Sequence, residues 1–418
     1  MSTLRAVEIC AGAGGQAIGL HRAGFHHELA IELDAHAAET LRLNTNWEVA
    51  EGDVADPTIW NPADFKGIDL LAGGVPCPPF SIAGKQLGSG DERDLFAWAV
   101  EQVAVVEPRA LLLENVRGLA SSRFAAYRQR VLDRLAEFGY VADWRLVHAA
   151  DFGIAQLRPR FVLVALKPGD AAYFDWPTPK KHRLTVGEAL RDLMAANGWP
   201  HADEWAALAN DVGPTLVGGS KKHGGADLGP TRAKRAWAEL FVDGRGVANE
   251  APNSDAPGPR ERAPKLTLEM VARLQGWSDS DDWDFAGRKT AQYRQIGNAF
   301  PPPVAEALGT AIARALRHEG PANEIPPLLS TVHDPLYLAL RSTDKFLSLQ
   351  AIADITGEQG LTSRKIQDKI TDLERDFFIE SKVMQGTLVY KLGDFRGFTG
   401  QIDHRRHDYL RTSRSKVS

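Results

Sequence analysis

The sequence predicts an α/β fold with a doubly wound, mostly parallel sheet, followed by an irregular second region and a small C-terminal domain. Three observations predict it. Residues 4–166 alternate short apolar runs with helical patterns, which is typical of parallel sheets. Residues 168–263 are rich in Gly, Pro, Trp and charged residues and break this alternation. Residues 330–395 read as two helices followed by a hairpin, and 418 residues suffice for two or three domains.

The first region contains the clearest elements. Strands are predicted at 5–10, 29–33, 68–72, 110–113 and 161–166, and helices at 15–23 and 34–44. Two further helices are predicted from apolar faces at spacings of three and four, formed by Phe96, Val100 and Val103 and by Phe124, Tyr127, Val131, Leu135 and Phe138. Later helices are predicted at 267–275, ended by Gly276, and at 303–316, where Pro303 suits a first helical position.

Changes in composition predict where one domain gives way to the next. We expect a first domain at 1–175, an irregular domain at 176–263, the C-terminal part of that irregular region with a helix returning to the first domain at 264–320, a winged-helix-like domain at 330–395 and a basic tail at 396–418. In the winged-helix-like domain a helix around Ile352, a second helix at 363–373 and a hairpin around Gln385-Gly386 follow one another. Modules of this shape bind DNA or other proteins.

The bulk composition narrows the class of protein. Two cysteines are too few for a disulfide framework, and they cannot supply a zinc site without several histidines at ligand spacing, so we expect no metal. The chain shows no signal peptide and no apolar stretch of about 18 residues, so we expect a cytoplasmic protein with no membrane partner. A net charge of −5 disfavours a wholly basic nucleic-acid binder but is compatible with a local basic face.

A glycine-rich turn after the first strand predicts a nucleotide-like ligand. Its residues are Cys10, Ala11, Gly12, Gly14 and Gly15. Glycines there let a ligand approach the backbone at the start of a helix. Glu32 ends the second strand, where it can accept ribose hydroxyls, and Asp53 follows the third, where it can accept an exocyclic amine. The turn lacks a phosphate-gripping pattern, which favours S-adenosylmethionine, although either acid is as readily a solvated strand end.

A thiol stands where the sheet predicts a ligand site. Cys77 follows the strand at 68–72 in a loop stiffened by Pro76, Pro78 and Pro79, and ligands of such sheets bind beyond the strand ends. Cys10, by contrast, reads as a small buried hydrophobe. Further groups are expected to converge on the thiol: Glu114 directly after the strand at 110–113, one face formed by Gln156, Arg158 and Arg160, and Asn298 in a proline-flanked turn.

These motifs, in this order, resemble the cytosine-5 DNA methyltransferases of bacterial restriction-modification systems over about residues 5–316. The resemblance rests on Glu8–Gly15, Pro76-Cys77, Glu114-Asn115-Val116, Gln156–Arg160, Lys265–Trp277 and Gly297-Asn298. It implies the S-adenosylmethionine-dependent methyltransferase fold, with a catalytic domain at 1–175 and target recognition at 176–263. It departs from the family at Cys10, where an aromatic residue is usual, and at Val75-Pro76-Cys77-Pro78, where Pro-Pro-Cys-Gln is common.

The resemblance also implies roles for single residues. Cys77 is the expected nucleophile, assisted by Glu114, Arg158 and Arg160. The expected cofactor contacts are Cys10, Ala11, Gly12, Gly14, Gly15, Glu32, Asp53, Pro76, Leu95 and Asn298. The expected DNA contacts are Gln156, Lys221, Lys222, Arg232 and Arg235, although each basic residue alone is as readily part of a solvated loop.

The expected reaction is methylation of carbon 5 of a flipped-out cytosine in a specific duplex DNA sequence. A cognate restriction endonuclease is a further functional partner that the resemblance implies, and we expect the protein to act as a monomer. Three alternatives stay open. They are a tRNA cytosine-5 methyltransferase, a catalytically silent DNA-binding regulator, and an adenine amino-methyltransferase. The last is disfavoured because Pro76-Cys77 stands where that class carries an Asn/Asp-Pro-Pro-aromatic motif.

Overall fold

The computed structural model describes residues 3–76, 93–218, 225–324, 334–357, 362–374 and 376–395. The chain divides into two compact units. Unit 1 comprises Met1–Val75, Val106–Val116 and Trp144–Glu324, and unit 2 comprises Pro76–Val105, Arg117–Asp143 and Ile325–Ser418. The first predicted domain is thus shared between both units, while the predicted recognition region falls within unit 1. The predicted domain boundaries therefore stay predictions.

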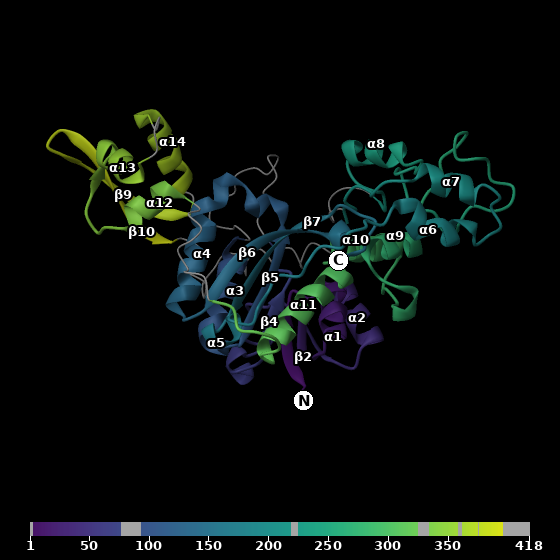
Figure 1. The fold of residues 1–418 in the computed structure, drawn as a ribbon, viewed down its shortest axis with the longest axis horizontal. Coiled ribbons are helices and arrows are strands. Elements are labelled where there is room, and N and C mark those ends of the chain that lie inside the picture. Colours follow the sequence, from purple (N-terminus) through teal and green to yellow (C-terminus); the bar gives the residue numbers. More distant parts are fainter. Residues whose placement is uncertain are drawn as a thin grey trace. The chain divides into compact units, whose positions relative to one another are not determined.

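A seven-stranded sheet forms the centre of the fold (Figure 1). Its strands are β1 (Leu4–Ile9), β2 (Phe25–Glu32), β3 (Glu48–Glu51), β4 (Leu70–Gly73), β5 (Ala110–Val116), β6 (Val141–His148) and β7 (Pro159–Leu166). Their order is β3-β2-β1-β4-β5-β7-β6. The first five strands pair in parallel, and β7 runs antiparallel to β5. This confirms the predicted mostly parallel, doubly wound sheet.

The strand order reverses between β1 and β4. These neighbours pair in parallel, and their carboxyl ends coincide, since Ile9 lies opposite Gly73. From β1 the chain continues outward to β2 and β3, whereas from β4 it continues outward in the other direction to β5. Connections that leave in opposite directions open a crevice at the strand ends, and ligands of open α/β sheets bind there. The glycine turn after β1 and the segment leading to Cys77 both start at this crevice.

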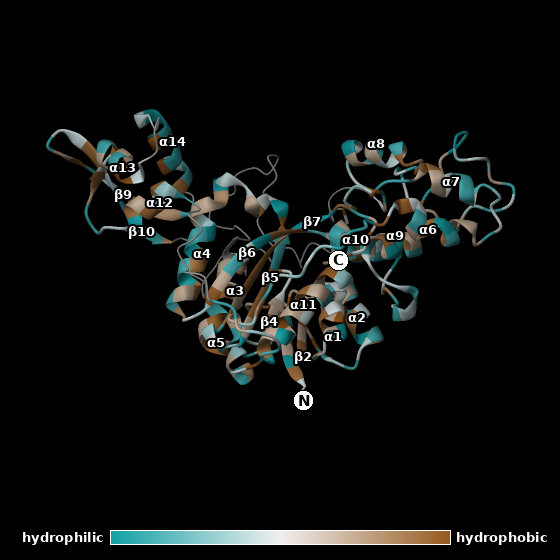
Figure 2. Cartoon of the chain, in the orientation of Figure 1, coloured by the Kyte–Doolittle hydropathy of each residue, from teal (hydrophilic) through white to brown (hydrophobic). Residues whose placement is uncertain are grey.

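Helices complete unit 1: α1 (Gly15–Arg22), α2 (Ala35–Asn44), α5 (Pro168–Ala171), α6 (Val186–Ala195), α7 (Ala202–Leu208), α8 (Thr231–Glu239), α9 (Leu268–Gln275), α10 (Lys289–Asn298) and α11 (Pro302–Leu316). Helix α9 has the predicted ends, because Thr267 caps its first turn and Gly276 adopts a left-handed conformation. Helix α11 packs Val304, Leu308 and Ile312 into the core beneath the sheet. Figure 2 shows the apolar character of these strands and of this helix face.

The predicted irregular region is better ordered than its composition suggests. It contributes α6, α7 and α8 and part of a second hydrophobic core, in which Trp199, Trp205 and Trp237 pack with Leu266 and Leu274 of the following segment. All three indoles are nearly or fully buried. The apolar residues of this core come from short helices and loops, so they show no long periodic pattern in the sequence. Residues 249–264 contain no helix or strand.

Several elements differ from the predictions. Strand β5 continues to Val116, so Glu114 lies within the strand and not after it. Strand β3 was predicted only as the third strand before Asp53, without bounds, and β6 was not predicted, because charged residues interrupt their apolar pattern. Helix α10 was also not predicted, and it places Asn298 at a helix end and not in a proline-flanked turn.

Unit 2 contains α3 up to Val105, α4 and the C-terminal module. The bounds are α3 (Arg93–Val106), α4 (Ala125–Glu137), α12 (Pro335–Arg341), α13 (Leu349–Thr356), α14 (Ser363–Leu373), β8 (Leu347–Ser348), β9 (Phe377–Met384) and β10 (Thr387–Phe395). The helix pair and the following hairpin match the predicted arrangement, with strand order β8-β10-β9. The module is tied to α4, because the Tyr337 hydroxyl donates to Asp133 Oδ2 at 2.9 Å.

Two classes of feature are absent from the part of the chain that the structure describes. No helix there is both long and apolar enough to cross a bilayer. No group of three or more His, Cys, Asp or Glu side chains there is arranged to hold a metal ion.

Candidate active site

The glycine turn after β1 is fastened to the end of β2 through Glu32. The Gly12 amide donates to Glu32 Oε2, and the Asp34 amide donates to Oε1, each at 2.7 Å. Burial raises the pKa of the Glu32 carboxyl, while these backbone N–H groups act in the opposite direction. A side chain added at Gly12 would meet no atom within 4 Å, so open space adjoins the turn. The turn and Glu32 therefore line one open site.

Asp53 lies beyond the neighbouring strand end. Strand β3 pairs with β2 so that Glu51 lies opposite Glu32, and the Gly52 amide donates to the Glu32 carbonyl at 2.9 Å. Asp53 is half-buried, and its Oδ1 accepts from the Ala55 amide at 3.0 Å. Glu32 and Asp53 thus come from adjacent strand ends on the same side of the crevice.

Gly74 marks the point where three separate elements meet. A side-chain carbon placed on Gly74 would lie 3.6 Å from Glu114 Oε2, 3.7 Å from the Cys10 carbonyl and 4.0 Å from Gln16 Oε1. The Asn115 amide donates to the Val75 carbonyl at 3.0 Å and so ties β5 to the same segment. The Glu114 carboxylate consequently contacts a position three residues before the predicted nucleophile, at the mouth of the crevice.

Gln16 is a site residue that the sequence did not reveal. It lies in the first turn of α1 and is 3% exposed, yet neither its Oε1 nor its Nε2 has a hydrogen-bond partner among the residues that the structure describes. Leaving a buried amide unbonded is costly, so such groups in native proteins usually bond to a ligand or water. A glutamine in a helix carries no sequence signal of this role. Only the convergence at Gly74 identifies it.

Glu114 and Arg160 form a buried ion pair. Arg160 Nε lies 2.6 Å from Glu114 Oε1, and the two side chains are 11% and 12% exposed respectively. Burial raises the pKa of the Glu114 carboxyl, and the positive charges of Arg160 and Arg158 partly offset this. Burial likewise lowers the pKa of Arg160. The second oxygen, Oε2, is the one that faces Gly74.

Arg158 and Gln156 are buried and form hydrogen bonds between distant segments of the chain, so neither faces an open surface. Arg158 is fully buried, and it donates to the carbonyls of Leu216, Gly297 and Ala299 at 2.7 to 2.9 Å. Its φ of 24° breaks the extended chain, so the predicted common face of Gln156, Arg158 and Arg160 is wrong. Gln156 is also fully buried.

The side-chain amide of Gln156 bonds only to other groups of the protein among the described residues. Its Nε2 donates to the Leu274 carbonyl and to Gln275 Oε1, both at 2.9 Å, and its Oε1 accepts from the Leu216 amide at 2.8 Å. This placement differs from the surface position that a direct DNA contact requires. Gln156 and Arg158 instead join the start of β7 to the recognition region and to the link between α10 and α11.

Asn298 lies at the end of α10 and is exposed. The recognition region reaches it, because a side chain on Gly218 would meet Asn298 Oδ1 at 2.3 Å and one on Gly297 would meet the Gly218 backbone at 2.5 Å. Gly15 lies close to the short link between α10 and α11, since a side chain on Gly15 would meet the Phe300 carbonyl at 2.3 Å. The end of α10 thus borders the glycine turn.

The remaining predicted residues have varied positions. Cys77, Lys221 and Lys222 lie outside the described residues. Cys10 is half-buried with a φ of 52°, so the expectation of a fully buried thiol is wrong. Pro76 is exposed and Leu95, on α3, is half-buried, and both belong to unit 2.

Two predicted DNA contacts share one exposed face of α8. Arg232 and Arg235 are three positions apart and both exposed. Lys234, between them, donates instead to Asp227 Oδ2 at 2.7 Å. Helix α8 therefore offers two arginines for contact with a partner.

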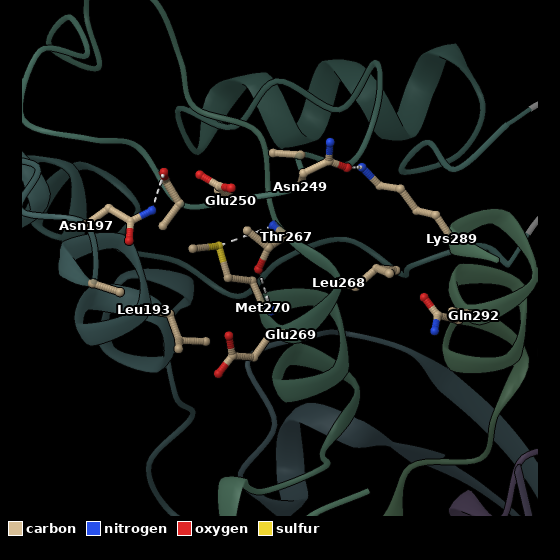
Figure 3. A pocket seen from close by; sticks show the side chains of 13 residues that line it. Leu193, Asn197, Asn249, Glu250, Thr267, Leu268, Glu269, Met270, Lys289 and Gln292 are labelled. Atoms are coloured by element: carbon tan, nitrogen blue, oxygen red, sulfur yellow. Dashed lines mark hydrogen bonds between the residues drawn. The ribbon is translucent and has the colours of Figure 1, made fainter. Parts of the chain in front are cut away.

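A pocket of about 460 Å³ lies in the recognition region and the segment after it (Figure 3). Asn197, Glu250, Glu269 and Lys289 are among its polar lining residues. Lys289 is held at its edge by Asn249 Oδ1 at 2.8 Å. None of the lining residues is a predicted catalytic or cofactor residue within the part of the chain that is described, so this pocket is separate from the crevice.

Comparisons with known proteins agree with this architecture. The family model of the C-5 cytosine-specific DNA methylases matches residues 4–314. The chain is 59% identical to the Type II methyltransferase M.NaeI of Lentzea aerocolonigenes over the full length of both chains. It is 48% identical to the Type II methyltransferase M.NgoMIV of Neisseria gonorrhoeae, over 75% of this chain and 98% of the relative.

One solved structure is similar in fold, and this similarity concerns the fold and not the function. A candidate DNA modification methyltransferase encoded within a prophage of E. coli is 22% identical with a TM-score of 0.51, over 75% of this chain and 99% of that one. The matched family region contains the glycine turn, Glu114, Arg160 and Asn298. The chain belongs to the C-5 cytosine-specific DNA methylases.

Proposed function

We propose that this enzyme methylates carbon 5 of one cytosine within a specific duplex DNA sequence, with S-adenosylmethionine as methyl donor and Cys77 as nucleophile. The observation that carries the proposal is the convergence of the Glu114 carboxylate, the Cys10 carbonyl and the Gln16 amide around Gly74, three residues before Cys77. This convergence lies at the crevice between β1 and β4.

The residues at the crevice fit S-adenosylmethionine. Open space adjoins Gly12, and the buried Gln16 amide bonds to none of the described residues and so can bond to a ligand. Glu32 holds the turn in place and retains lone pairs for ribose hydroxyls. Asp53 and Asn298 would complete the contacts. When bound, the cofactor supplies an electrophilic methyl group.

Cys77 would act by covalent catalysis. Carbon 5 of cytosine is a weak nucleophile, and addition of a thiolate to carbon 6 makes it enamine-like. A free thiol with a pKa near ~8.5 is only a few per cent thiolate at neutral pH, so nearby positive charge favours attack. After methyl transfer, loss of the carbon 5 proton and expulsion of the Cys77 thiolate restore the aromatic ring.

Glu114 would hold the cytosine during this attack. Addition at carbon 6 places charge on the ring, and a carboxyl group at ring nitrogen 3 and the exocyclic amine stabilises it. Because Arg160 engages Oε1, Oε2 would be the oxygen that meets the base. Arg158 would act as a positioning residue, since its guanidinium binds three backbone carbonyls.

The reaction requires the base to leave the duplex, because the stacked helix hides carbon 6. Arg232 and Arg235 on α8, with Lys221 and Lys222, would contact the DNA around the target. The 59% identical relative is named as a Type II methyltransferase, so we infer a role in protecting cytoplasmic host DNA from a cognate restriction endonuclease.

The test compares wild type with Cys77→Ser in two assays. Transfer of labelled methyl from S-adenosylmethionine should occur on duplex DNA and not on tRNA, and bisulfite sequencing of DNA from expressing cells should reveal one methylated cytosine in a fixed sequence. Cys77→Ser should lose at least about 1,000-fold in rate, as expected for removal of a covalent nucleophile. Wild-type methylation by Cys77→Ser, or transfer to tRNA alone, would contradict the proposal.

A further inference from the structure

Strand β9 forms one edge of the small C-terminal sheet. The sheet order is β8-β10-β9, and β9 pairs only with β10 among the described residues. From Glu380 to Met384 every residue of the strand is exposed, and Val383 is 69% and Met384 48% exposed. In Figure 1 the yellow β9–β10 hairpin extends past helix α13 of the same unit. A long exposed edge with apolar side chains is a template for pairing with another strand.

The hairpin turn determines which backbone groups point outward from this edge. Met384 lies opposite Thr387, and the two residues between them, Gln385 and Gly386, have φ of 50° and 77°. This is a two-residue type I′ turn, in which the flanking pair is hydrogen-bonded. Alternation along the strand then directs the N–H and C=O groups of Ile379, Ser381 and Val383 away from β10.

The residues around Ser381 are complementary to themselves. The strand reads Phe378-Ile379-Glu380-Ser381-Lys382-Val383-Met384, so an antiparallel copy centred on Ser381 meets matching partners. Ile379 faces Val383 of the second copy, and Glu380 faces Lys382 of the second copy, each twice by symmetry. Apolar and opposite-charge pairs of this kind stabilise adjacent strands.

The outward backbone groups fit the same register. With Ser381 opposite its own copy, the hydrogen-bonded pairs are Ser381–Ser381 and Ile379–Val383, the residues whose groups point outward. Glu380 and Lys382 then form the non-hydrogen-bonded pairs, in which side chains approach most closely. Centring the pairing on Glu380 or Lys382 instead sets two like charges directly opposite each other, which destabilises a pair.

We propose that two copies of this protein associate through β9, in antiparallel register centred on Ser381, to form a continuous six-stranded sheet. This replaces the single-copy state expected from the sequence. One strand edge is a small contact surface, so the dimer dissociates on dilution, with a dissociation constant on the order of 1–100 µM. The interaction is independent of the methylation chemistry, because β9 carries none of the predicted catalytic or cofactor residues.

A charge-exchange experiment on the full-length protein tests the register. Sedimentation velocity across about 1–200 µM should show a concentration-dependent dimer for wild type. Glu380→Lys and Lys382→Glu should each weaken self-association at least about tenfold, because each sets like charges opposite each other. An equimolar mixture of the two variants should recover the dimer, and so should the double variant, since both restore opposite charges. Glu374→Lys, the same charge change at an exposed residue outside β9, should leave the dimer unchanged.

Loss of the β9 contact must be distinguished from unfolding and from association through another surface. Far-UV circular dichroism and methyl transfer should match wild type in every variant, so a loss of dimer reports the edge and not unfolding. A wild-type protein that stays monomeric up to about 200 µM overturns the proposal. Dimerisation of a truncated protein that lacks residues 396–418 would not rescue it, because the proposal concerns the full-length chain. A dimer that both single charge variants retain assembles through a different surface and overturns it as well.

Discussion

The guanidinium of Arg160 and the carboxylate of Glu114 are diagonal neighbours across two antiparallel strands. Glu114 lies opposite Val162 and Arg160 lies opposite Val116, so both side chains leave the same face of the sheet. Their closest atoms are 2.6 Å apart in surroundings from which most water is excluded. A buried carboxylate is tolerated only with such a partner. The pair therefore fixes one oxygen of Glu114 and leaves the other directed at the crevice.

Glu114→Gln should reduce methyl transfer about 100- to 10,000-fold while DNA binding is largely retained. The amide keeps the shape of the side chain but cannot transfer a proton to ring nitrogen 3, which gains negative charge when the thiolate adds to carbon 6. Single-turnover rates on duplex DNA measure the loss, and Glu101→Gln, an acid that pairs with Arg134 on another element, is the matched control. A Glu114→Gln enzyme with a wild-type single-turnover rate would exclude this carboxylate from the chemistry.

The stability of the protein should depend on pH through Glu114. Burial raises its pKa above the ordinary value of 4.5, so the folded state binds the proton more tightly than the unfolded state. The stabilising contribution is complete below 4.5 and disappears as the pH rises through the raised pKa. The free energy of unfolding of wild type, relative to Glu114→Gln, should therefore fall as the pH rises from 4.5. Urea titrations at several pH values measure it, and a constant difference would show that the pKa is not raised.

The sequence predicted the sheet well where strands are uniformly apolar. Leu70–Gly73 and the first part of β5 are buried on both faces, and this produces the apolar runs that identify them. Strand β3 has the sequence Glu-Val-Ala-Glu and lies at the sheet edge, so its burial is partial and its pattern weak. The spacing of Glu32 and Asp53 still placed both acids at neighbouring strand ends.

The site was predicted only in part, because some roles depend on packing and not on residue type. Arg158 and Arg160 are both arginines and lie two positions apart, so the alternation of side chains along an extended strand predicts that they share one face. The positive φ of Arg158 sends its guanidinium to three carbonyls from distant segments, which no local pattern reveals. Gln16 is similarly identified only because its buried amide has no partner in the described part of the chain.

Gln16→Met should have opposite effects on stability and on cofactor affinity. Methionine has a similar volume and needs no hydrogen bonds, so the free energy of unfolding should rise by about 1–2 kcal/mol. Affinity for S-adenosylmethionine should fall about tenfold, because one hydrogen-bonding group is lost. Isothermal titration calorimetry and urea unfolding measure the two effects. Gln350→Met, whose amide bonds to Asp354 on α13, is the control for the substitution itself. Unchanged cofactor affinity in Gln16→Met would assign the amide to buried water.

Arg158→Lys should destabilise unit 1 by about 2–4 kcal/mol, because one ammonium cannot serve three buried carbonyls from three directions. Arg160→Lys is the matched comparison. It keeps a positive charge beside Glu114, so its cost should be smaller, about 1 kcal/mol. Urea unfolding measures the stability of both variants. The KM for DNA distinguishes a structural role of Arg158 from a role in binding the substrate base. If Arg158→Lys were as stable as wild type and raised only the KM for DNA, Arg158 would contact substrate and not the carbonyls.

Replacing both exposed arginines of α8 should weaken DNA binding in a salt-dependent way. If Arg232 and Arg235 each neutralise one phosphate, the double alanine variant should lower the slope of log affinity against log salt by about 1.8. The matched control is Arg191→Ala with Arg260→Ala, two exposed arginines of the same region that pair with Asp203 and Glu204. Fluorescence anisotropy with a labelled duplex at several salt concentrations measures the slope. Equal slopes in the two double variants would remove α8 from the DNA interface. A lower affinity with an unchanged slope, together with altered preference for one base pair, would assign these arginines to base edges and not to phosphates.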